Sequence, residues 1–439
     1  MEIEPRQKPK LLLINPGADK DRLGSRRRRK SSIAQLSLPL LAVRAGDRFE
    51  IEILNESVSD LDFNRPADLV GISVMTPLAP RAYAIADEFR RRDSKVVLGG
   101  LHVFFREAEA AGHADALLVG EAEKVWDRLL DDFLDGRLQR RYQAKSPHDL
   151  SGLPRPRLDL LNQRAYSFAN VMETGRGCPH HCQYCSVTAY WGNRYRFRPI
   201  PEVVEEMAAM PPGVVTFVDD NIFGNPARAR ELLLAIKPLG RRWQAQSDLR
   251  VARDPELLRL AVESGCEWLF IGLESTDPEN LKAVGKRELN LAGEFSSSLT
   301  ALRRAGIKIF GSFILGMDHD DASVFARTVR FCIENKLEGA NFYIFTPYPG
   351  TPLYEQMESE GRLLHRDWSK YDSNHVVFRP QRMTPEELMR GYLWTYRNFY
   401  SFGSIWKRVL RPRRDLGPVL ASNLGRRMNY RRFAEGCRD

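Results

Sequence analysis

The chain has 439 residues and a net charge of +9 at pH 7, with 43% hydrophobic and 28% charged residues. This ordinary globular composition excludes a disordered chain, a collagen-like fibre and a small disulfide scaffold, and the length predicts two or three domains. No apolar run reaches the roughly 18 residues of a membrane-spanning helix. The N-terminal segment lacks the apolar stretch of a secretory signal, so we expect a cytoplasmic protein.

Residues 1–145 alternate short apolar segments with helical ones, which predicts an α/β domain with a doubly wound parallel sheet. A helix is expected at 81–91, where apolar residues recur at helical spacing. Ligands on such sheets bind at the carboxyl ends of the strands, and these ends fall at 15–17, 73–77, 99–102 and 120–123. The expected strands are 11–14, 49–54, 68–75, 95–100 and 116–120.

A Pro-rich, polar segment at 146–165 is predicted to link this domain to the next. Residues 166–350 again alternate strand and helix, and six units of about 30 residues are typical of a partial β/α barrel. The spacing alone fits a second doubly wound sheet equally well. Residues 351–439 are aromatic and basic without a strand pattern, so we expect a helical region. The six strands are expected near 168–173, 214–218, 243–247, 268–273, 308–315 and 341–346.

Three cysteines carry the strongest chemical signal. Cys178, Cys182 and Cys185 have the spacing CxxxCxxC in a loop that begins with two glycines. The loop follows the first strand of the predicted barrel, and barrel active sites lie at that end of the strands. Three thiolates can bind three irons of a 4Fe-4S cluster and leave the fourth iron open to a ligand. Zinc is the alternative, with His180 or His181 as the fourth ligand that a structural zinc site usually needs.

This spacing, with the aromatic Tyr184 before the last cysteine, resembles the signature of the radical SAM superfamily. The resemblance implies a partial (βα)6 barrel in which Cys178, Cys182 and Cys185 hold a 4Fe-4S cluster. It also implies that S-adenosylmethionine (SAM) binds the open iron and is cleaved by one electron to a 5′-deoxyadenosyl radical. A flavodoxin- or ferredoxin-type protein is the implied electron donor.

Further segments match the family in their order after the cysteines, and the resemblance assigns them to SAM binding. Asp219 and Asp220 could instead cap the next helix, and the two glycines could instead serve strand packing. Cys266 and Cys332 stand in apolar surroundings and are expected in the core. The residues that the resemblance assigns to SAM are Tyr184, Asp219, Asp220, Glu274, Gly311 and Gly316.

The N-terminal strand ends resemble the cobalamin-binding domain that precedes the barrel in one radical SAM subfamily. The matching segments are DLVGISVMT, KVVLGGLH and GEAE, and the tandem resemblance covers about residues 10 to 400. The first strand-end loop, 15–25, contains no histidine, so no axial cobalt ligand is expected from it. A domain that kept the fold and lost the cofactor is the alternative. The residues that the resemblance places near cobalamin are Ser73, Thr76, Gly99, Gly100 and Glu121.

Aromatic residues are dense at 392–406, and basic clusters follow at 407–414 and 426–432, besides the basic run at 26–30. The helical spacing favours core packing of the aromatic residues. The alternative is a lid on an apolar substrate, next to a basic tail that contacts an anionic membrane surface. No nucleic-acid motif accompanies the charge. We therefore expect an apolar small-molecule substrate, no nucleic-acid partner and a location that includes the membrane periphery.

The resemblance implies a cobalamin-dependent C-methyltransferase. A radical SAM cyclase or rearrangement enzyme of the same architecture, similar to the tetrapyrrole cyclases, is the alternative. A methylthiotransferase is less favoured because that family has additional N-terminal cysteines and this N-terminal region has none. A cobalamin or iron–sulfur sensor without activity is less favoured because the cysteine loop is intact and the SAM-binding segments are present.

Overall fold

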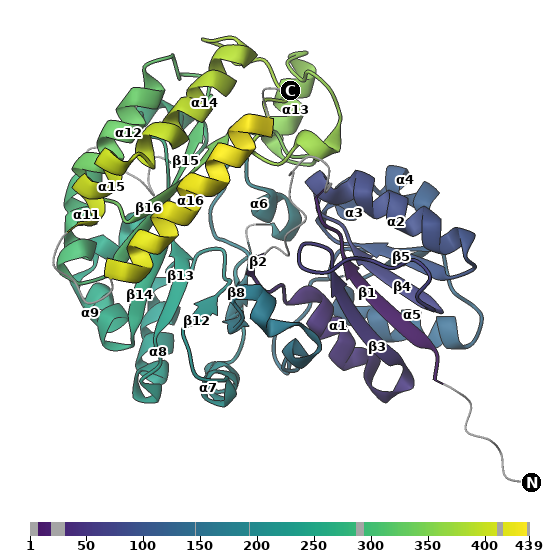
Figure 1. Ribbon diagram of the computed structural model, residues 1–439. Helices are drawn as coiled ribbons and strands as arrows, with labels where there is room; N and C mark the ends of the chain where they lie inside the picture. Colours follow the sequence, from purple (N-terminus) through teal and green to yellow (C-terminus); the bar gives the residue numbers. More distant parts are fainter. Residues whose placement is uncertain are drawn as a thin grey trace, which may run out of the picture. The chain divides into compact units, whose positions relative to one another are not determined.

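The computed structural model describes residues 8–18, 31–144, 146–192, 194–286, 294–410 and 416–436 (Figure 1). The basic run at 26–30 lies outside these ranges, as do Cys437 and four residues of the 407–414 cluster. The chain divides into two compact units, Met1–Val171 and Met172–Asp439.

The first unit contains a six-stranded sheet in the order β3-β1-β4-β5-β6-β7, in which every neighbouring pair is parallel. This confirms the predicted doubly wound sheet. The strand order reverses between β1 and β4, which is where such sheets bind ligands. The strands are β1 Lys10–Asn15, β3 Glu50–Asn55, β4 Leu69–Ser73, β5 Lys95–Gly99, β6 Ala116–Val119 and β7 Arg141–Gln143.

Helices cover both faces of this sheet (Figure 1). Two of them are joined by the Trp126 indole, whose Nε1 donates to the Leu41 carbonyl at 3.1 Å. A small parallel pair, β2 Ser31–Ile33 with β8 Tyr166–Phe168, adds the residues directly after the 146–165 segment to the unit. The helices are α1 Ser37–Ala45, α2 Ala79–Arg91, α3 Leu101–Phe105, α4 Glu107–Ala110 and α5 Trp126–Leu134.

The second unit contains a six-stranded sheet in the order β16-β15-β14-β13-β12-β9. Its strands follow one another in sequence without a reversal, which is the order of a β/α barrel and excludes a second doubly wound sheet. The sheet does not close, so the predicted partial barrel is confirmed. The strands are β9 Val171–Met172, β12 Val215–Phe217, β13 Trp243–Ser247, β14 Cys266–Glu274, β15 Lys308–Leu315 and β16 Gly339–Ile344.

Several barrel helices begin with the same type of side-chain N-cap. Asn225, Asp254 and Thr351 each accept a hydrogen bond from a backbone N–H of the first turn, and a proline follows each cap. Such caps end the preceding loop at a defined residue. The helices are α6 Ser186–Trp191, α7 Ile200–Ala209, α8 Pro226–Ile236, α9 Pro255–Glu263, α10 Pro278–Ala283, α11 Phe295–Arg304, α12 Val324–Glu334, α13 Pro352–Ser359, α14 Pro385–Phe399, α15 Phe402–Val409 and α16 Leu416–Gly436.

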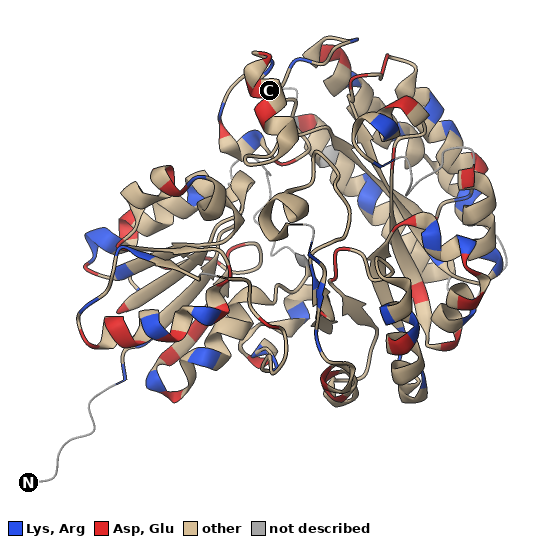
Figure 2. Ribbon diagram, turned by 180° about the vertical axis from the view of Figure 1, so that it is seen from behind, with Lys and Arg blue, Asp and Glu red and all other residues tan. Residues whose placement is uncertain are grey.

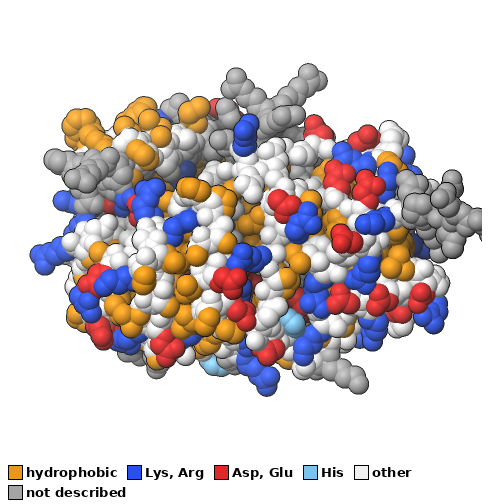
Figure 3. Space-filling model, turned by 90° about the horizontal axis from the view of Figure 1, so that it is seen from below, with side chains coloured by type: hydrophobic (Ala, Val, Ile, Leu, Met, Phe, Trp, Pro, Cys, Tyr) orange, Lys and Arg blue, Asp and Glu red, His pale blue; other side chains and the backbone are white. Residues whose placement is uncertain are grey.

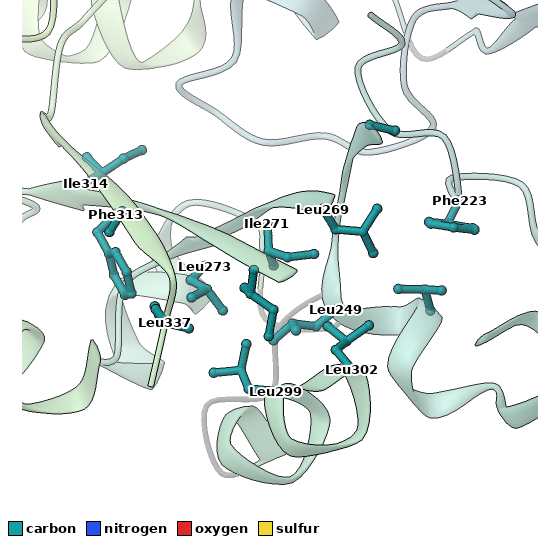
Figure 4. Packing of buried hydrophobic residues seen from close by; sticks show 14 of the residues in the cluster. Phe223, Leu249, Leu269, Ile271, Leu273, Leu299, Leu302, Phe313, Ile314 and Leu337 are labelled. Atoms are coloured by element: carbon teal, nitrogen blue, oxygen red, sulfur yellow. The ribbon is translucent and has the colours of Figure 1, made fainter. Parts of the chain in front are cut away.

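The core of the second unit lies between the sheet and these helices (Figure 4). Ile271 and Leu273 of β14 point toward Leu299 and Leu302 of α11. Cys266 and Cys332 are buried, as predicted. Burial raises the pKa of both thiols, so they remain protonated core residues.

The aromatic segment 392–406 serves mainly as core packing, as its helical spacing favours over the alternative of a lid. Tyr392, Phe399 and Tyr400 belong to the core cluster. Two tyrosine hydroxyls of this segment bind the outer edge of β16: Tyr400 donates to the Ala340 carbonyl at 2.7 Å, and Tyr396 to the Phe342 carbonyl at 3.1 Å. The N–H groups of Ala340 and Phe342 donate back to the same hydroxyls.

One member of the basic cluster at 407–414, Arg408, is buried. This side chain is only 1% exposed, and its guanidinium donates to the carbonyls of Leu337 at 2.6 Å and Phe399 at 3.0 Å. The guanidinium carbon also lies 3.7 Å from the centre of the Phe399 ring. Arg408 therefore fixes α15 to the barrel, because the guanidinium presents several donors that match these carbonyls.

Charges of both signs are interleaved along the helices of each unit (Figure 2). Pairs such as Lys237 with Glu263 and Arg259 with Glu263 are partly exposed and contribute little stability. The face drawn in Figure 3 likewise shows hydrophobic side chains between charged ones of both signs. Among the described residues, none of the helices is both long enough and apolar enough to span a membrane.

Candidate functional site

A cavity of about 430 Å³ opens in the second unit at the carboxyl ends of the strands, and the cysteine loop forms part of its wall. This volume is typical of a site for one small ligand. The residues that line it include Cys178, Cys182, Tyr184, Cys185, Asp220, Asn221, Asp248, Phe270, Glu274, Lys286, Ser312, Ile314, Tyr343, Phe345, Tyr348 and Ser373.

The cysteine loop is fixed at its base by a short antiparallel pair, β10 Gly175–Arg176 with β11 Arg196–Phe197. Gly177 has φ 92°, and a Cβ atom there would collide with the Arg194 carbonyl oxygen. Only glycine fits this position. Within the loop, the Cys185 N–H donates to the Cys182 carbonyl at 3.1 Å. The loop thus presents its three thiols to one cavity.

The three thiols fit a 4Fe-4S cluster. Burial raises the pKa of Cys178 to about 12 and that of Cys182 to about 11, so uncompensated thiolates would be costly here. Bound iron would supply the compensating positive charge. In the described ranges, no three His, Cys, Asp or Glu side chains are grouped so that they could hold a single metal ion. The candidate zinc ligand His180 instead faces Arg250, with Nε2 and Nη2 at 2.9 Å.

One buried oxygen beside the thiols has the character of a ligand-binding group. Asn221 is 4% exposed, and its Nδ2 donates to Asp248 Oδ2 at 2.8 Å. That bond fixes the amide so that Oδ1 faces the other way, and Oδ1 has no hydrogen-bond partner. A buried acceptor left unpaired is costly. The amino group of SAM would satisfy it, so this part of the cavity fits SAM.

Glu274 reaches the cavity through an unusual backbone conformation. The β14–β15 register shifts between Gly272 and Glu274, and Glu274 has φ 64°. Non-glycine residues in this conformation are strained and are concentrated at functional sites. Lys286 Nζ donates to Glu274 Oε1 at 2.6 Å and to the Gly272 carbonyl at 3.1 Å. Burial opposes the lysine charge most strongly, but Glu274, Cys182 and Asp248 together raise the pKa of Lys286.

The structure brings three of the six residues assigned to SAM into the cavity: Tyr184, Asp220 and Glu274. Burial raises the pKa of Asp220 to about 7, and the neighbouring Asp219 adds to the effect. Asp219 itself faces away from the cavity. It accepts hydrogen bonds from the Thr174 N–H at 2.9 Å and the Thr174 hydroxyl at 2.6 Å, which tie β12 to the base of the cysteine loop.

The two glycines assigned to SAM do not line the cavity. A Cβ atom at Gly311 would contact Leu337 and Phe313, and one at Gly316 would overlap the Leu388 side chain. Close packing thus explains both glycines. The cavity wall on this strand is formed instead by Ser312 and Ile314, because side chains alternate between the two faces of a sheet.

Sequence reasoning missed several cavity residues. Asp248 directly follows the predicted strand 243–247, so its place at a strand end was a usable signal. Lys286, Tyr343 and Ser373 follow no motif, and the fold alone brings them to the cavity. Ser373 has φ 61°, and it lies in a loop beyond the region that was predicted to form the barrel.

In the first unit, the predicted cobalamin residues lie at the carboxyl ends of β4, β5 and β6. Ser73 and Gly99 end two neighbouring strands and pair with each other. Gly100 has φ 103°, and a Cβ atom there would press on the Val74 backbone. Thr76 is buried, with its hydroxyl 3.3 Å from His102 Nδ1. Glu121 accepts a hydrogen bond from the His148 N–H of the 146–165 segment.

These strand ends fit a ligand with an apolar face. Met75 is 44% exposed at the reversal point, and Gly120 has φ 88° with open space where a Cβ would be. Backbone and apolar side chain can therefore approach a flat ring from this edge. The His102 ring is fully buried, so it is not available as an axial ligand of cobalt. Cobalamin would be held here by Ser73, Met75 and the strand-end glycines, without that histidine.

Comparisons with known proteins decide the family. A family model described as "Radical SAM superfamily" matches residues 172–332, from β9 to α12. The bacteriochlorophyllide d C-12(1)-methyltransferase of Chlorobaculum tepidum is 32% identical over 387 residues, which cover 85% of this chain and 84% of that protein. The chain belongs to the radical SAM superfamily. It is therefore an enzyme of the class that uses a 4Fe-4S cluster, SAM and an electron donor on a small-molecule substrate.

Two further matches cover nearly the whole chain. The bacteriochlorophyllide d C-8(2)-methyltransferase of the same organism is 31% identical over 407 residues, 88% of this chain and 90% of that protein. The structure of the radical SAM methyltransferase TsrM from Kitasatospora setae, with cobalamin and a 4Fe-4S cluster bound, has a TM-score of 0.70. It is 17% identical and covers 99% of this chain and 100% of that one, so it shows the shared fold. Residues 351–434 match a "Domain of unknown function (DUF4070)".

Proposed function

We propose that this radical SAM enzyme is a cobalamin-dependent methyltransferase that methylates an unactivated carbon of a largely apolar substrate. One observation carries the proposal: three cysteine thiols and the unpaired Asn221 oxygen line the same cavity. The strand-end residues of the first unit support cobalamin binding. The methyltransferase activities of the two relatives from Chlorobaculum tepidum favour methyl transfer over the cyclase alternative.

The chain's own residues would bind and orient the reactants. Cys178, Cys182 and Cys185 would ligate three irons, and Asn221 Oδ1 would accept a hydrogen bond from the SAM amino group. Tyr184 packs against Phe345, with ring centres 6.3 Å apart, and helps to exclude water. When bound, the cluster supplies the electron that cleaves SAM, and cobalamin carries the methyl group.

The cavity limits how a substrate can enter. Its volume of about 430 Å³ is that of one small ligand, so a large ring system would insert only the edge that carries the methylated carbon. Phe270, Ile314 and Phe345 provide an apolar wall for that edge. Since both relatives act on bacteriochlorophyllide d, we propose a chlorin-type tetrapyrrole as the substrate class.

The test is an anaerobic assay of the reconstituted enzyme with SAM, a reductant, cobalamin and bacteriochlorophyllide d. We expect a product heavier by one methylene group, detected by mass spectrometry. Protein reconstituted without cobalamin should still form 5′-deoxyadenosine but no methylated product. A product with an additional ring and no added carbon would favour the cyclase alternative. SAM cleavage with no change in the chlorin would contradict the proposed substrate class.

We also propose that α15 contacts an anionic membrane surface, where such a substrate would be met. Phe402 and Trp406 are 65% and 68% exposed, and the exposed Lys407 adjoins them. Aromatic and basic side chains together are typical of helices that bind at the lipid interface. The available charge is smaller than the sequence predicts, because Arg408 is buried and Arg426 is bonded to Asn341.

Liposome co-sedimentation tests this contact. We expect binding to vesicles that contain phosphatidylserine and little binding to pure phosphatidylcholine, with a loss at high salt because surface charges are screened over about 8 Å at physiological ionic strength. Substitution of both Phe402 and Trp406 by Ser should abolish sedimentation. The matched control is Leu234→Ser on α8, since Leu234 is 55% exposed. Equal sedimentation of all three proteins would contradict the proposal.

A further inference from the structure

A chain of three polar side chains joins the C-terminal helix α16 to the cavity wall. Arg426 of α16 lies over the Phe310 ring, 4.3 Å from its centre, and its Nη1 donates to Asn341 Oδ1 at 2.8 Å. Asn341 Nδ2 in turn donates to the Tyr343 hydroxyl at 2.7 Å. Asn341 and Tyr343 both belong to β16, and Tyr343 lines the cavity.

These hydrogen bonds can have only one order of donors and acceptors. A guanidinium has donors and no acceptor, so Arg426 requires that the carbonyl oxygen of Asn341 faces it. The amide NH2 group must then face Tyr343 and occupy a lone pair of the hydroxyl. The hydroxyl proton is left to find another acceptor. Among the described residues, the Tyr343 hydroxyl makes no second hydrogen bond.

The surroundings of the Tyr343 hydroxyl favour its protonated form, which can donate a hydrogen bond. Burial raises the pKa of Tyr343, and the bond from Asn341 only partly opposes the rise. Beside it on the wall is Ile314, its register partner on β15. Two other hydroxyls that line the cavity, those of Tyr348 and Ser373, bond to each other at 2.9 Å. Tyr343 thus offers its proton to the cavity next to an apolar side chain.

We propose that the Tyr343 hydroxyl donates a hydrogen bond to a carbonyl or carboxylate oxygen on the inserted edge of the substrate. Asn341 and Arg426 are positioning residues that hold the hydroxyl in this direction. The inference rests on the proposed function and adds a specificity-determining group to it. It also gives α16, which runs across the strands in Figure 1, a part in substrate recognition.

The position of Tyr343 favours the substrate over SAM as the acceptor. The groups that fit SAM and the cluster are Asn221 and the cysteine loop, which follow β12 and β9 at one edge of the sheet. Tyr343 is on β16, the strand at the other edge. The hydroxyl is therefore presented from the strand at the opposite edge of the sheet from β12, which is followed by Asn221, while the cysteine loop reaches the end of β16 through the contact of Tyr184 with Phe345.

The experiment measures the dissociation constants of bacteriochlorophyllide d and of SAM for the cluster-loaded protein, by fluorescence quenching and by equilibrium dialysis. Tyr343→Phe should weaken bacteriochlorophyllide binding about 3- to 10-fold, as expected for one lost hydrogen bond. Asn341→Leu should weaken it by a similar factor. The double variant should bind no more weakly than Tyr343→Phe, because Asn341 acts only through that hydroxyl.

Two matched controls keep the assignment specific. Tyr354→Phe removes a hydroxyl that bonds to Glu358 within α13, and Arg427→Met alters the neighbour of Arg426 that bonds to the Tyr400 carbonyl. Both should leave the bacteriochlorophyllide constant within twofold, whereas Arg426→Met should raise it and Arg426→Lys should restore it in part.

The outcomes separate this inference from the proposed function. No binding of bacteriochlorophyllide d by the unaltered protein overturns the proposed substrate class and this inference with it. Binding that Tyr343→Phe leaves unchanged overturns only the role of Tyr343. A rise in the SAM constant in place of the bacteriochlorophyllide constant shows that the hydroxyl serves SAM, and it overturns the proposal. Additive losses in the double variant overturn the positioning role of Asn341.

Discussion

Cys182→Ala should abolish cluster binding and reduce the formation of 5′-deoxyadenosine to background. Cys182 is the most buried of the three thiols, and two cysteines cannot hold the cluster with one differentiated iron. The same loss is expected for Cys178→Ala and Cys185→Ala. Iron and sulfide content, the visible absorbance of the cluster and the SAM cleavage product measure the effect after anaerobic reconstitution.

Cys332→Ala is the matched control, because Cys332 is fully buried in the barrel core and does not line the cavity. It should retain full cluster content and SAM cleavage. A Cys182→Ala protein that still produces 5′-deoxyadenosine at the unaltered rate would contradict the assignment of the loop as the cluster site.

Arg408→Met should lower the free energy of unfolding of the second unit by about 3 kcal/mol, since hydrogen bonds to charged groups each contribute about 1.5–3 kcal/mol and the buried carbonyls would lose them. The substitution leaves the carbonyls of Leu337 and Phe399 without their donor, and it also removes the bond to Asn423 Oδ1 at 3.1 Å on α16. Urea unfolding followed by tryptophan fluorescence measures the change.

Lys407→Met is the control at the neighbouring position. Lys407 is exposed, so its substitution should change the unfolding free energy by less than about 0.5 kcal/mol. Limited proteolysis gives a second measure, because α15 and α16 should be cut sooner in Arg408→Met. Identical urea midpoints for Arg408→Met and Lys407→Met would refute the anchoring role of Arg408.

Most strands could be predicted because each is a short apolar run bounded by Gly, Pro or polar residues. The segments 243–247 and 308–315 coincide with β13 and β15. The strands β2, β7 and β8 were missed, since each has only three residues, which are too few to form a pattern. Spacing alone did not distinguish a barrel from a second doubly wound sheet, because strand order is a property of the tertiary fold.

Site residues could be predicted where they belong to a short sequence motif or directly follow a predicted strand. They could not be predicted where only the fold brings them to the cavity. The cysteine spacing and the strand-end residue Asp220 could be found from the sequence. Lys286 could not, because it reaches Glu274 from the turn after α10 through the fold alone. Gly311 resembled a ligand-contacting residue, but its lack of a side chain serves the packing of Leu337. Local patterns do not separate these two uses of glycine.

The bonds from Tyr396 and Tyr400 to β16 have a consequence for association between molecules. A partial barrel leaves a strand edge open, and an open edge is a template for pairing with a strand of another chain. The two hydroxyls occupy the outward backbone groups of Ala340 and Phe342. They act as side-chain substitutes for a seventh strand, and they protect the enzyme from edge-to-edge aggregation while the barrel stays open.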